Sequence, residues 1–279
     1  MSDRAAPTHA AMSGRLALLG AGKLGEALLR GLIDAAVVTP DQVTVTAAHA
    51  ERVAELEALG VRGTTSNADA VKGAAVVLLS VKPQTVAAVL ADLRGVLEPQ
   101  QLLVSVAASV GTAFIEKQLD RPVPVIRAMP NTPALIRSGM TALAPGRHAT
   151  KAHLDQALAL FRPLGRTLVI DEKHMNAVTA LSASGPAFIY IIIESLAEGG
   201  VKVGLPRAIA TELAAQTVLG SGAMVLETGE HPAKLKDLVT TPAGCTIDGI
   251  LELEEGGLRV TLIKTVVRAT QRAGELLER

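Results

Sequence analysis

Aromatic residues and cysteine are scarce in this sequence. Its 279 residues include no tryptophan, one tyrosine, three phenylalanines and one cysteine. Nucleic-acid binders usually carry a basic surplus and stack bases on aromatic side chains. The chain has 27 basic and 27 acidic residues, so its formal net charge is zero and we expect no nucleic-acid partner. One cysteine cannot form an internal disulfide or a multi-cysteine metal site, so we expect a cytoplasmic protein without a metal.

Long hydrophobic runs are also lacking. The most apolar run, residues 188–193, ends at Glu194 and falls far short of the ~20 residues that a membrane span requires. Residues 1–13 lack the apolar core of a signal peptide, and we interpret them as a disordered tail. We therefore expect no membrane segment. Hydrophobic residues still make up 49% of the chain, so it can bury a substantial core.

Strand and helix patterns alternate in the first part of the chain. Residues 23–34 and 51–59 have the apolar spacing of amphipathic helices. Short apolar runs typical of buried strands occupy residues 15–20, 43–47, 74–81, 102–107, 123–129, 140–144 and 167–171. This alternation predicts a Rossmann-type, doubly wound parallel sheet with helices on both faces, over residues 14–172. No such alternation continues beyond it, and we expect residues 173–279 to form an all-helical domain.

A glycine fingerprint, G-x-G-x-x-G, follows the first expected strand and opens the first expected helix. Gly20 permits the tight turn, Gly22 lets the backbone approach a pyrophosphate, and Gly25 allows close packing of helix and strand. Unpaired amides at the helix start then face the anion. A glycine-rich turn used only for packing is the alternative. The cofactor contacts predicted here are Gly20, Ala21, Gly22, Lys23, Leu24 and Gly25.

The second expected strand lacks the acidic residue that NAD sites place at its end, where it binds the ribose 2′-hydroxyl. Ala47 and Ala48 stand there, followed by His49 and Arg52, which could bind a 2′-phosphate. We therefore predict NADPH and regard NADH as possible but less favoured. The alternative for His49 and Arg52 is an ordinary solvated helix start.

Other strand ends meet at the same edge of such a sheet, where ligands bind. Ser80, Val81 and Lys82 are candidates for the ribose and nicotinamide end, although Lys82 could equally be a solvated helix-start residue. Asn131, between two prolines in residues 129–133, is a further candidate.

Six stretches of the sequence, in order, resemble the pyrroline-5-carboxylate reductase family, whose members make proline by reducing a cyclic imine. The stretches are GAGKLGEALLRGL, VKPQ, RAMPNTPALIRSGMTAL, SASGPAFIY, GVKVGLPRAIATELAAQTVLGSGAM and LVTTPAGCTIDGILELEEGGLR. The resemblance implies an oxidoreductase of proline biosynthesis with a small-molecule substrate. It also implies a homodimer or higher homo-oligomer whose sites are shared between subunits.

The resemblance assigns site residues by position. Asn67, Ala107 and Ala108 would join the cofactor contacts, and the substrate would lie among Val239, Thr241, Gly244, Cys245 and Thr246. Three residues depart from the family pattern, which usually has glycine at these positions: Ser109, Ala183 and Ala243. Ser109 matters most, because its side chain could press on the nicotinamide.

The stretch VTTPAGCTIDG, residues 239–249, interrupts the helical pattern with small and hydroxylated residues. Unpaired amides at a helix start can bind the substrate carboxylate. Thr241 could reach that carboxylate, and Thr246, the candidate catalytic residue, could turn its hydroxyl toward the ring nitrogen. Thr246 could instead be only an N-cap. We interpret Cys245 as a space-filling residue, because hydride reduction of an imine needs no nucleophile.

Two other classes share parts of this pattern. β-Hydroxyacid dehydrogenases also join a Rossmann domain to a helical one, but they need a lysine on the first long helix of the second domain. Residues 182–200 contain no lysine. A protein that only senses NADPH would be free to lose the stretch at residues 239–249, and this chain retains it.

Overall fold

The structure is a computed structural model that describes residues 12–275. The predicted disordered tail therefore lies outside the described residues, except for Met12 and Ser13. The Met12 amide donates a hydrogen bond of 2.8 Å to the Val37 carbonyl, so the described chain begins attached to the fold.

The chain forms two compact units. The first, here called the nucleotide unit, comprises residues 12–183 and 269–275 of the described chain, and the second, the helical unit, comprises Ser184–Arg268. The border thus falls at Ser184, whereas the change in sequence pattern led us to place it after residue 172. Each unit is described by itself.

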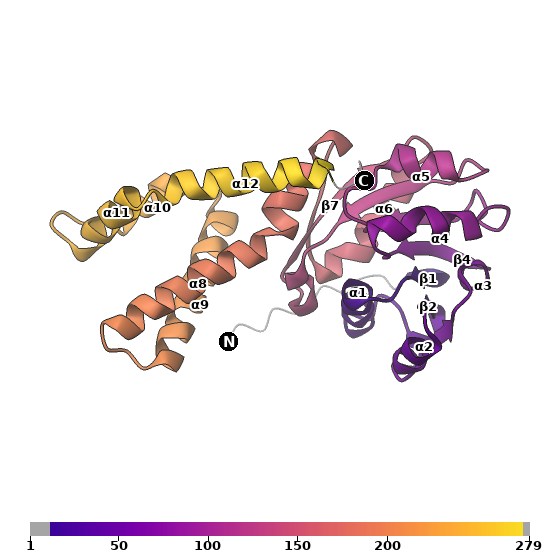
Figure 1. The fold of residues 1–279 in the computed structure, drawn as a ribbon, viewed down its shortest axis with the longest axis horizontal. Coiled ribbons are helices and arrows are strands. Elements are labelled where there is room, and N and C mark those ends of the chain that lie inside the picture. The colour runs from indigo at the N-terminus through magenta and orange to yellow at the C-terminus, as the bar shows by residue number, and fades with distance from the viewer. Residues whose placement is uncertain (1–11, 276–279) are drawn as a thin grey trace. The chain divides into compact units, whose positions relative to one another are not determined.

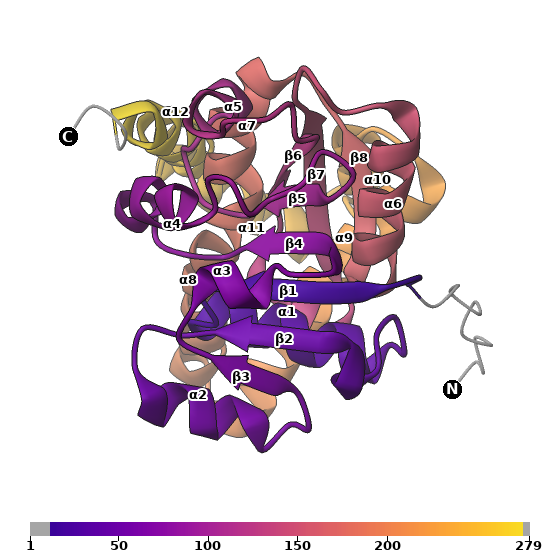
Figure 2. The same cartoon turned by 90° about the vertical axis from the view of Figure 1, so that its right-hand side faces the viewer.

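An eight-stranded sheet forms the centre of the nucleotide unit, with the strand order β3-β2-β1-β4-β5-β6-β7-β8 (Figure 2). Its strands are β1 (Arg15–Leu19), β2 (Val43–Thr46), β3 (Arg62–Thr64), β4 (Ala74–Leu79), β5 (Leu102–Ser105), β6 (Val125–Met129), β7 (Gly139–Pro145) and β8 (Gly165–Val169). The doubly wound sheet is confirmed, and the short strand β3 is an addition that the sequence pattern did not predict.

One strand pair departs from the parallel arrangement that we expected. Strand β7 runs antiparallel to β6, whereas all other neighbouring pairs are parallel. Only residues 130–138 connect β6 to β7, and a parallel connection needs a crossover of roughly a dozen residues or more. The link is too short for that crossover, so β7 returns beside β6.

Helices cover both faces of this sheet (Figure 1). The helices of the nucleotide unit are α1 (Lys23–Asp34), α2 (Ala50–Glu57), α3 (Asn67–Ala70), α4 (Val86–Asp92), α5 (Thr112–Gln118), α6 (Lys151–Phe161) and α7 (Met175–Val178). Shorter 3₁₀ turns are η1 (Pro40–Gln42), η2 (Pro83–Thr85), η3 (Thr132–Ile136), η4 (Arg162–Leu164) and η5 (Glu172–His174), and η6 (Thr179–Ala183) is a π-helical turn.

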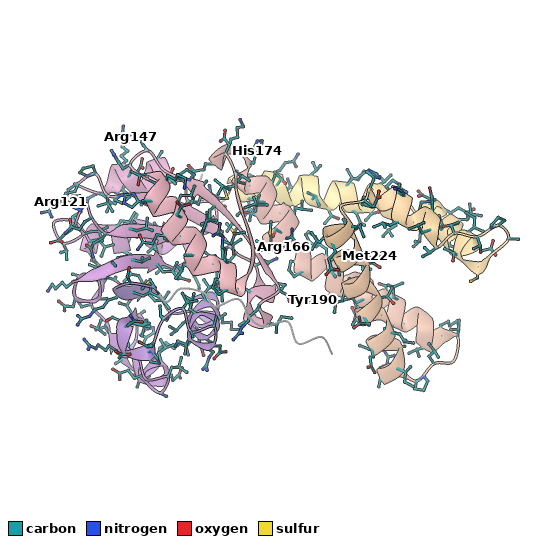
Figure 3. All side chains as sticks on the ribbon, turned by 180° about the vertical axis from the view of Figure 1, so that it is seen from behind. Arg121, Arg147, Arg166, His174, Tyr190 and Met224 are labelled. Atoms are coloured by element: carbon teal, nitrogen blue, oxygen red, sulfur yellow. The ribbon has the colours of Figure 1, made fainter. Side chains whose placement is uncertain are left out.

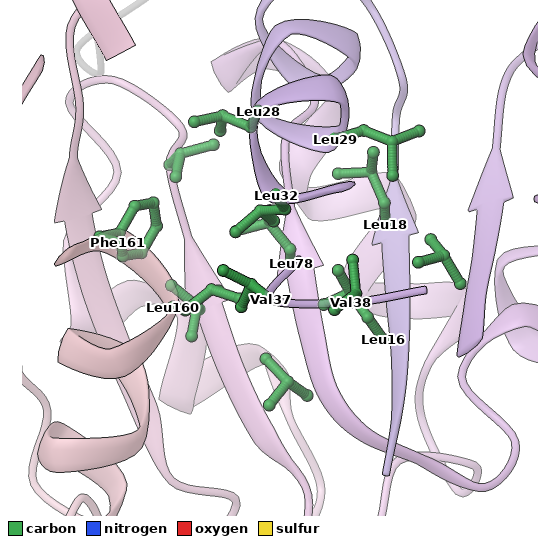
Figure 4. Close-up of a cluster of buried hydrophobic side chains, with 14 of the residues drawn as sticks. Leu16, Leu18, Leu28, Leu29, Leu32, Val37, Val38, Leu78, Leu160 and Phe161 are labelled. Atoms are coloured by element: carbon green, nitrogen blue, oxygen red, sulfur yellow. The ribbon is translucent and has the colours of Figure 1, made fainter. Parts of the chain in front are cut away.

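Two large apolar clusters hold these layers together. In one, Leu28, Leu32 and Phe161 of α1 and α6 pack with Leu16 and Leu78 of the sheet (Figure 4). The other cluster joins the opposite strand faces to α3, α4 and α5. Each fully buried leucine or phenylalanine contributes about 1.5–3 kcal/mol of transfer free energy. The fingerprint loop between β1 and α1 is thus anchored at both of its ends.

The helical unit contains α8 (Gly185–Lys202), α9 (Arg207–Thr228), α10 (Pro232–Leu238), α11 (Cys245–Glu255) and the first part of α12 (Leu258–Glu275). Helices α8 and α9 pack through small residues, since a Cβ on Gly200 would lie 3.0 Å from the Ala210 Cβ. The all-helical character predicted for this part of the chain is confirmed.

Large apolar side chains of the helical unit are mostly exposed. Tyr190 of α8 is 60% exposed and Met224 of α9 is 49% exposed (Figure 3), whereas its buried residues are Ala197, Ala210 and Ala214. By length and composition alone, Glu172–Lys202 and Arg207–Thr228 would be long and apolar enough to cross a membrane, and little of either is buried. The expectation of no membrane segment therefore stays a prediction. An apolar surface of this extent needs cover, by a partner or by lipid.

Candidate active site

The fingerprint loop has the geometry that its three glycines predict. Gly20 has φ +82°, and a Cβ there would lie 2.2 Å from Val81 Cγ1. A Cβ on Gly25 would lie 2.9 Å from the Gly20 carbonyl oxygen and 3.1 Å from Ser80 Oγ. Gly22 differs, because no atom lies within 4 Å of an added Cβ. Two glycines thus permit close packing, and the third leaves open space above the loop.

Helix α1 begins directly at this open space. Gly22 is its N-cap and provides no side-chain hydrogen bond. Within the described chain, the amides of Lys23, Leu24 and Gly25 have no hydrogen-bond partner. Unpaired amides at a helix N-terminus bind anions, and the helix dipole adds to this. The loop therefore fits the pyrophosphate of a dinucleotide.

A chain of hydrogen bonds fixes the loop to strand β2. The Gly20 amide donates to Thr46 Oγ1 over 3.1 Å, and Thr46 Oγ1 donates to Asn67 Oδ1 over 2.9 Å. The Ala21 amide donates to the Thr46 carbonyl over 2.8 Å. Asn67 also donates to Asp92 Oδ2 over 3.0 Å. Sequence reasoning missed Thr46, although a polar residue at the end of a buried strand needs a partner.

Ser80 follows the end of β4, beside the fingerprint loop. Its hydroxyl oxygen is buried and has no hydrogen-bond partner among residues 12–275. An orphaned buried hydroxyl beside an open anion site fits a ligand group. Val81 packs against Gly20, and Lys82 is exposed at the start of η2.

Arg52 reaches the same loop from α2. Its Nε and Nη2 atoms both donate to the Ala21 carbonyl over 3.3 Å, and Nη2 also contacts Glu26 of α1. Hydrogen bonds from Arg52, and then from Arg30, hold the pKa of the Glu26 carboxyl below its ordinary value. His49, the N-cap of α2, is exposed and makes no side-chain cap bond. The Arg52 guanidinium therefore lies against the loop, which its position in the sequence did not reveal.

Asn131 uses its side-chain amide within the nucleotide unit. Its Oδ1 accepts a hydrogen bond of 2.8 Å from the Met140 amide, and its Nδ2 donates to the Ser182 carbonyl over 3.2 Å. The residue also lines a cavity of about 260 Å³ beside Lys23 and Leu24. Asn131 therefore ties the ends of β6 and β7 to η6 while facing the start of α1.

The loop after β5 contains Ala107, Ala108 and Ser109. Ser109 has φ +65°, in the left-handed region where glycine is favoured, and it is buried. Its hydroxyl donates a hydrogen bond of 2.7 Å to the Ala273 carbonyl, in the last turn of α12. This bond commits the Ser109 hydroxyl to Ala273, and the contact that its side chain could make with the nicotinamide stays a prediction. Ala183 ends η6 and packs, partly buried, against a small apolar cluster.

Residues 239–249 form a tight turn followed by α11, in the helical unit. The Gly244 amide donates to the Thr241 carbonyl over 3.1 Å, and Ala243 within this turn has φ +55°. A Cβ on Gly244 would lie 2.4 Å from Thr241 Oγ1, so a larger residue here would displace the Thr241 hydroxyl. Ala243, like Ser109, thus occupies a left-handed position that favours glycine.

Gly244, not Thr246, is the N-cap of α11. The alternative that Thr246 serves only as an N-cap is therefore wrong, because Thr246 lies inside the first helical turn. As in α1, a glycine N-cap provides no side-chain hydrogen bond, and the Cys245 and Thr246 amides have no partner in the part of the chain that the structure describes. Cys245 is exposed, and Thr246 is partly buried.

The predicted site residues therefore form two sets. The cofactor set from Gly20 to Asn131 lies in the nucleotide unit, where strand ends bring it together. The substrate set, from Val239 to Thr246, lies at the start of α11 in the helical unit. Each set is organised around a glycine-capped helix start with unpaired amides.

Comparison with known families agrees with this division. Residues 172–276 match the family model described as pyrroline-5-carboxylate reductase dimerisation. Residues 15–109 match the family model described as NADP oxidoreductase, coenzyme F420-dependent.

Relatives match almost the entire chain. The pyrroline-5-carboxylate reductase of Methanosarcina acetivorans is 43% identical over 94% of this chain and 97% of its own length. That of Escherichia coli is 37% identical over 95% and 99%. A solved structure of the Coxiella burnetii reductase has a TM-score of 0.86 at 34% identity, covering 94% of this chain and 98% of its own. The Plasmodium falciparum reductase, solved with NADP bound, also has a TM-score of 0.86, at 26% identity over 95% and 98%.

Proposed function

Because this chain belongs to the pyrroline-5-carboxylate reductase family, we propose that it reduces 1-pyrroline-5-carboxylate to L-proline with NADPH, the last step of proline biosynthesis. One observation carries the proposal: the described chain has two helices that begin at a glycine N-cap and leave their first-turn amides unpaired. One follows the first strand of a dinucleotide fold, and the other lies in the stretch that resembles the family signature. The first start would bind the pyrophosphate of the dinucleotide, and the second would bind the carboxylate of the substrate.

The cofactor would bind across the strand ends of the nucleotide unit. The amides after Gly22 would bind the pyrophosphate. The orphaned Ser80 hydroxyl, with Asn67, Ala107 and Ala108, would contact the rest of the cofactor. Arg52 and His49 would face the 2′-phosphate that distinguishes NADPH from NADH. NADH lacks this phosphate, so the site favours it less.

The substrate would be held by the start of α11. The Cys245 and Thr246 amides, with the Thr241 hydroxyl, can donate hydrogen bonds to its carboxylate. Val239 and Gly244 would complete the lining of the substrate site. The Thr246 hydroxyl can contact the ring nitrogen. The imine carbon accepts hydride more readily when the ring nitrogen is protonated, and because this nitrogen takes its proton from water, these residues need only position the imine. Bound NADPH supplies the hydride.

The exposed apolar surface of α8 to α12 supports a homodimer or higher homo-oligomer in which a second copy covers it. The sites would then draw on two subunits. In this proposal, the two long apolar segments are interface helices, and the protein is a cytoplasmic enzyme without a membrane or nucleic-acid partner.

The experiment is a spectrophotometric assay at 340 nm with purified protein, pyrroline-5-carboxylate and either NADPH or NADH. We expect imine-dependent NADPH oxidation with proline formed in equal amount, and a lower kcat/KM with NADH. If neither cofactor is oxidised, the proposal is wrong. If NADH matches NADPH in kcat/KM, only the assignment of the 2′-phosphate contacts is wrong.

A further inference from the structure

We propose that the two carboxylates on Arg52 have opposite roles: Glu26 positions the arginine for the 2′-phosphate, and Glu55 occupies the place that the phosphate takes. This inference rests on the proposed function, because it assumes that Arg52 faces the 2′-phosphate. It adds two residues that sequence reasoning did not single out.

The Arg52 guanidinium has a defined free edge. Of its five N–H groups, Nε donates one to the Ala21 carbonyl, and Nη2 donates to the same carbonyl and to Glu26. Nη1 donates one hydrogen to Glu55 Oε2 over 2.7 Å. Its second hydrogen has no partner within residues 12–275. The Nε–Nη2 side is therefore fixed to the fingerprint loop, and the Nη1 side remains for a ligand.

The two carboxylates differ in how firmly they are held. Glu26 is 24% exposed, lies in the first turn of α1 and also pairs with Arg30 over 2.7 Å. Glu55 is 64% exposed. It pairs with Arg52, three residues away on the same helix. An exposed i,i+3 pair contributes little and gives way easily. A ligand can therefore displace Glu55 while Glu26 stays in place.

A phosphate is the ligand that fits this edge. It carries up to two negative charges and binds guanidinium groups through paired, charge-assisted hydrogen bonds. After the Glu55 carboxylate leaves, both Nη1 hydrogens can point to phosphate oxygens. Arg52 joins α2, which begins just after the end of β2, to the loop at Ala21. In a dinucleotide fold the adenosine ribose binds between these two segments.

The proposal predicts that Glu26→Gln and Glu55→Gln change phosphate affinity in opposite directions, which long-range electrostatics alone would not produce. Glu26→Gln and Glu55→Gln each remove one negative charge near the site, so long-range attraction alone would strengthen phosphate binding in both variants. If Glu26 positions Arg52, its loss weakens binding instead. Glu55→Gln is thus the matched control for Glu26→Gln, with the same chemical change on the same arginine.

The test measures dissociation constants for 2′,5′-ADP and for 5′-AMP by titration calorimetry, on the intact protein and its variants. We expect Glu26→Gln to weaken 2′,5′-ADP binding about fivefold, and Glu55→Gln to strengthen it about threefold. We expect 5′-AMP, which lacks the 2′-phosphate, to bind each variant as it binds the original protein. Arg30→Ala leaves the Glu26–Arg52 contact but removes one of the two cations that hold Glu26, so it should weaken 2′,5′-ADP binding less than Glu26→Gln does.

Arg52→Ala distinguishes a failure of the 2′-phosphate assignment from a failure of the roles proposed for Glu26 and Glu55. If it leaves 2′,5′-ADP binding unchanged, Arg52 does not bind the 2′-phosphate, and that part of the proposed function fails. If Arg52→Ala weakens binding but Glu26→Gln and Glu55→Gln shift it in the same direction, only the opposed roles are wrong. Equal changes for 2′,5′-ADP and 5′-AMP in Glu26→Gln would mean a structural role for Glu26.

Discussion

The starts of α1 and α11 are built alike and lie in opposite surroundings. Both have a glycine N-cap, and both leave first-turn amides unpaired within the described chain. The α1 start follows a buried strand and is fixed by hydrogen bonds to Thr46. The turn before α11 is exposed except at Thr240 and Gly244, which are partly buried, and no residue of α11 is buried.

This difference shows how the two halves of the proposed site are stabilised. The nucleotide unit contains two large clusters of buried leucine, valine and isoleucine, so its anion site is rigid within one chain. The buried core of the helical unit consists of alanines. A stable domain needs more buried apolar area than this. In the proposed homo-oligomer, a second copy would cover this unit and hold the substrate half rigid.

The largest expected effect is at Gly20. Gly20→Ala adds a Cβ that collides with Val81 at φ +82°, and we expect a loss of about 3 kcal/mol in the free energy of unfolding, together with weaker NADPH binding. Gly73→Ala is the control, because Gly73 has φ +71° with no atom within 4 Å, so only the backbone cost of about 1 kcal/mol remains. Urea unfolding measures both. Equal losses would contradict the close packing of the loop on Val81.

Thr246→Val tests the α11 start. Because Thr246 is not the N-cap, we expect unchanged stability and a fall in kcat/KM for the imine of about 30-fold, with unchanged KM for NADPH. Thr240→Val is the matched control: the Thr240 hydroxyl donates to the Lys236 carbonyl within α10, so its loss should leave kcat/KM unchanged. A destabilised Thr246→Val variant with full turnover would restore a structural role.

Ser109 separates backbone strain from hydrogen bonding. Ser109→Ala keeps the left-handed backbone and loses the bond to Ala273, so we expect a loss of about 1 kcal/mol in the free energy of unfolding. Ser109→Gly loses the same bond but relieves the strain, and should be close to neutral. Thermal or urea unfolding decides, and a Gly variant less stable than the Ala variant would contradict this account.

Ala243→Gly, in the turn before α11, should slightly raise the free energy of unfolding. Glycine adopts φ +55° without strain, so we expect a stabilisation of about 0.5–1 kcal/mol. Ala36→Gly makes the same change at φ +54° in the nucleotide unit. If the helical unit is stable only as an oligomer, the gain from Ala243→Gly will depend on protein concentration, and that from Ala36→Gly will not. Unfolding at two concentrations checks this.

The smallest effect concerns pH. The pKa of Glu26 is lowered in the fold, first by its hydrogen bond with Arg52, so its contribution is complete above the pKa of an unfolded glutamate, about 4.3. It is lost as the pH falls through the lowered value. The difference in unfolding free energy between the original protein and Glu26→Gln should be a few tenths of a kcal/mol at pH 7 and should shrink below about pH 4. A difference that grows in acid would contradict the ion pair.

Sequence patterns predicted the sheet, the fingerprint loop and the helical second part, because each rests on local periodicity or on glycines at fixed spacing. They missed the antiparallel β7, which depends on the length of one connection, and the short strand β3. They also missed the contacts of Arg52 with Ala21 and Glu26, because these join residues far apart in the chain. The bond from Ser109 to Ala273 spans 164 positions, and no local pattern reveals it.

Subunit complementation tests most directly the claim that the two helix starts divide the site and that a second copy completes it. Gly22→Asp adds a carboxylate in the open space above the loop, at a position that accepts an acidic N-cap, and should abolish NADPH binding without unfolding. Thr246→Val damages the substrate half. Co-expressed with different tags and purified as mixed oligomers, the two variants should regain activity well above either alone, since some sites then combine two intact halves from different subunits. Activity no higher than the average of the two variants would mean that each site lies within one chain.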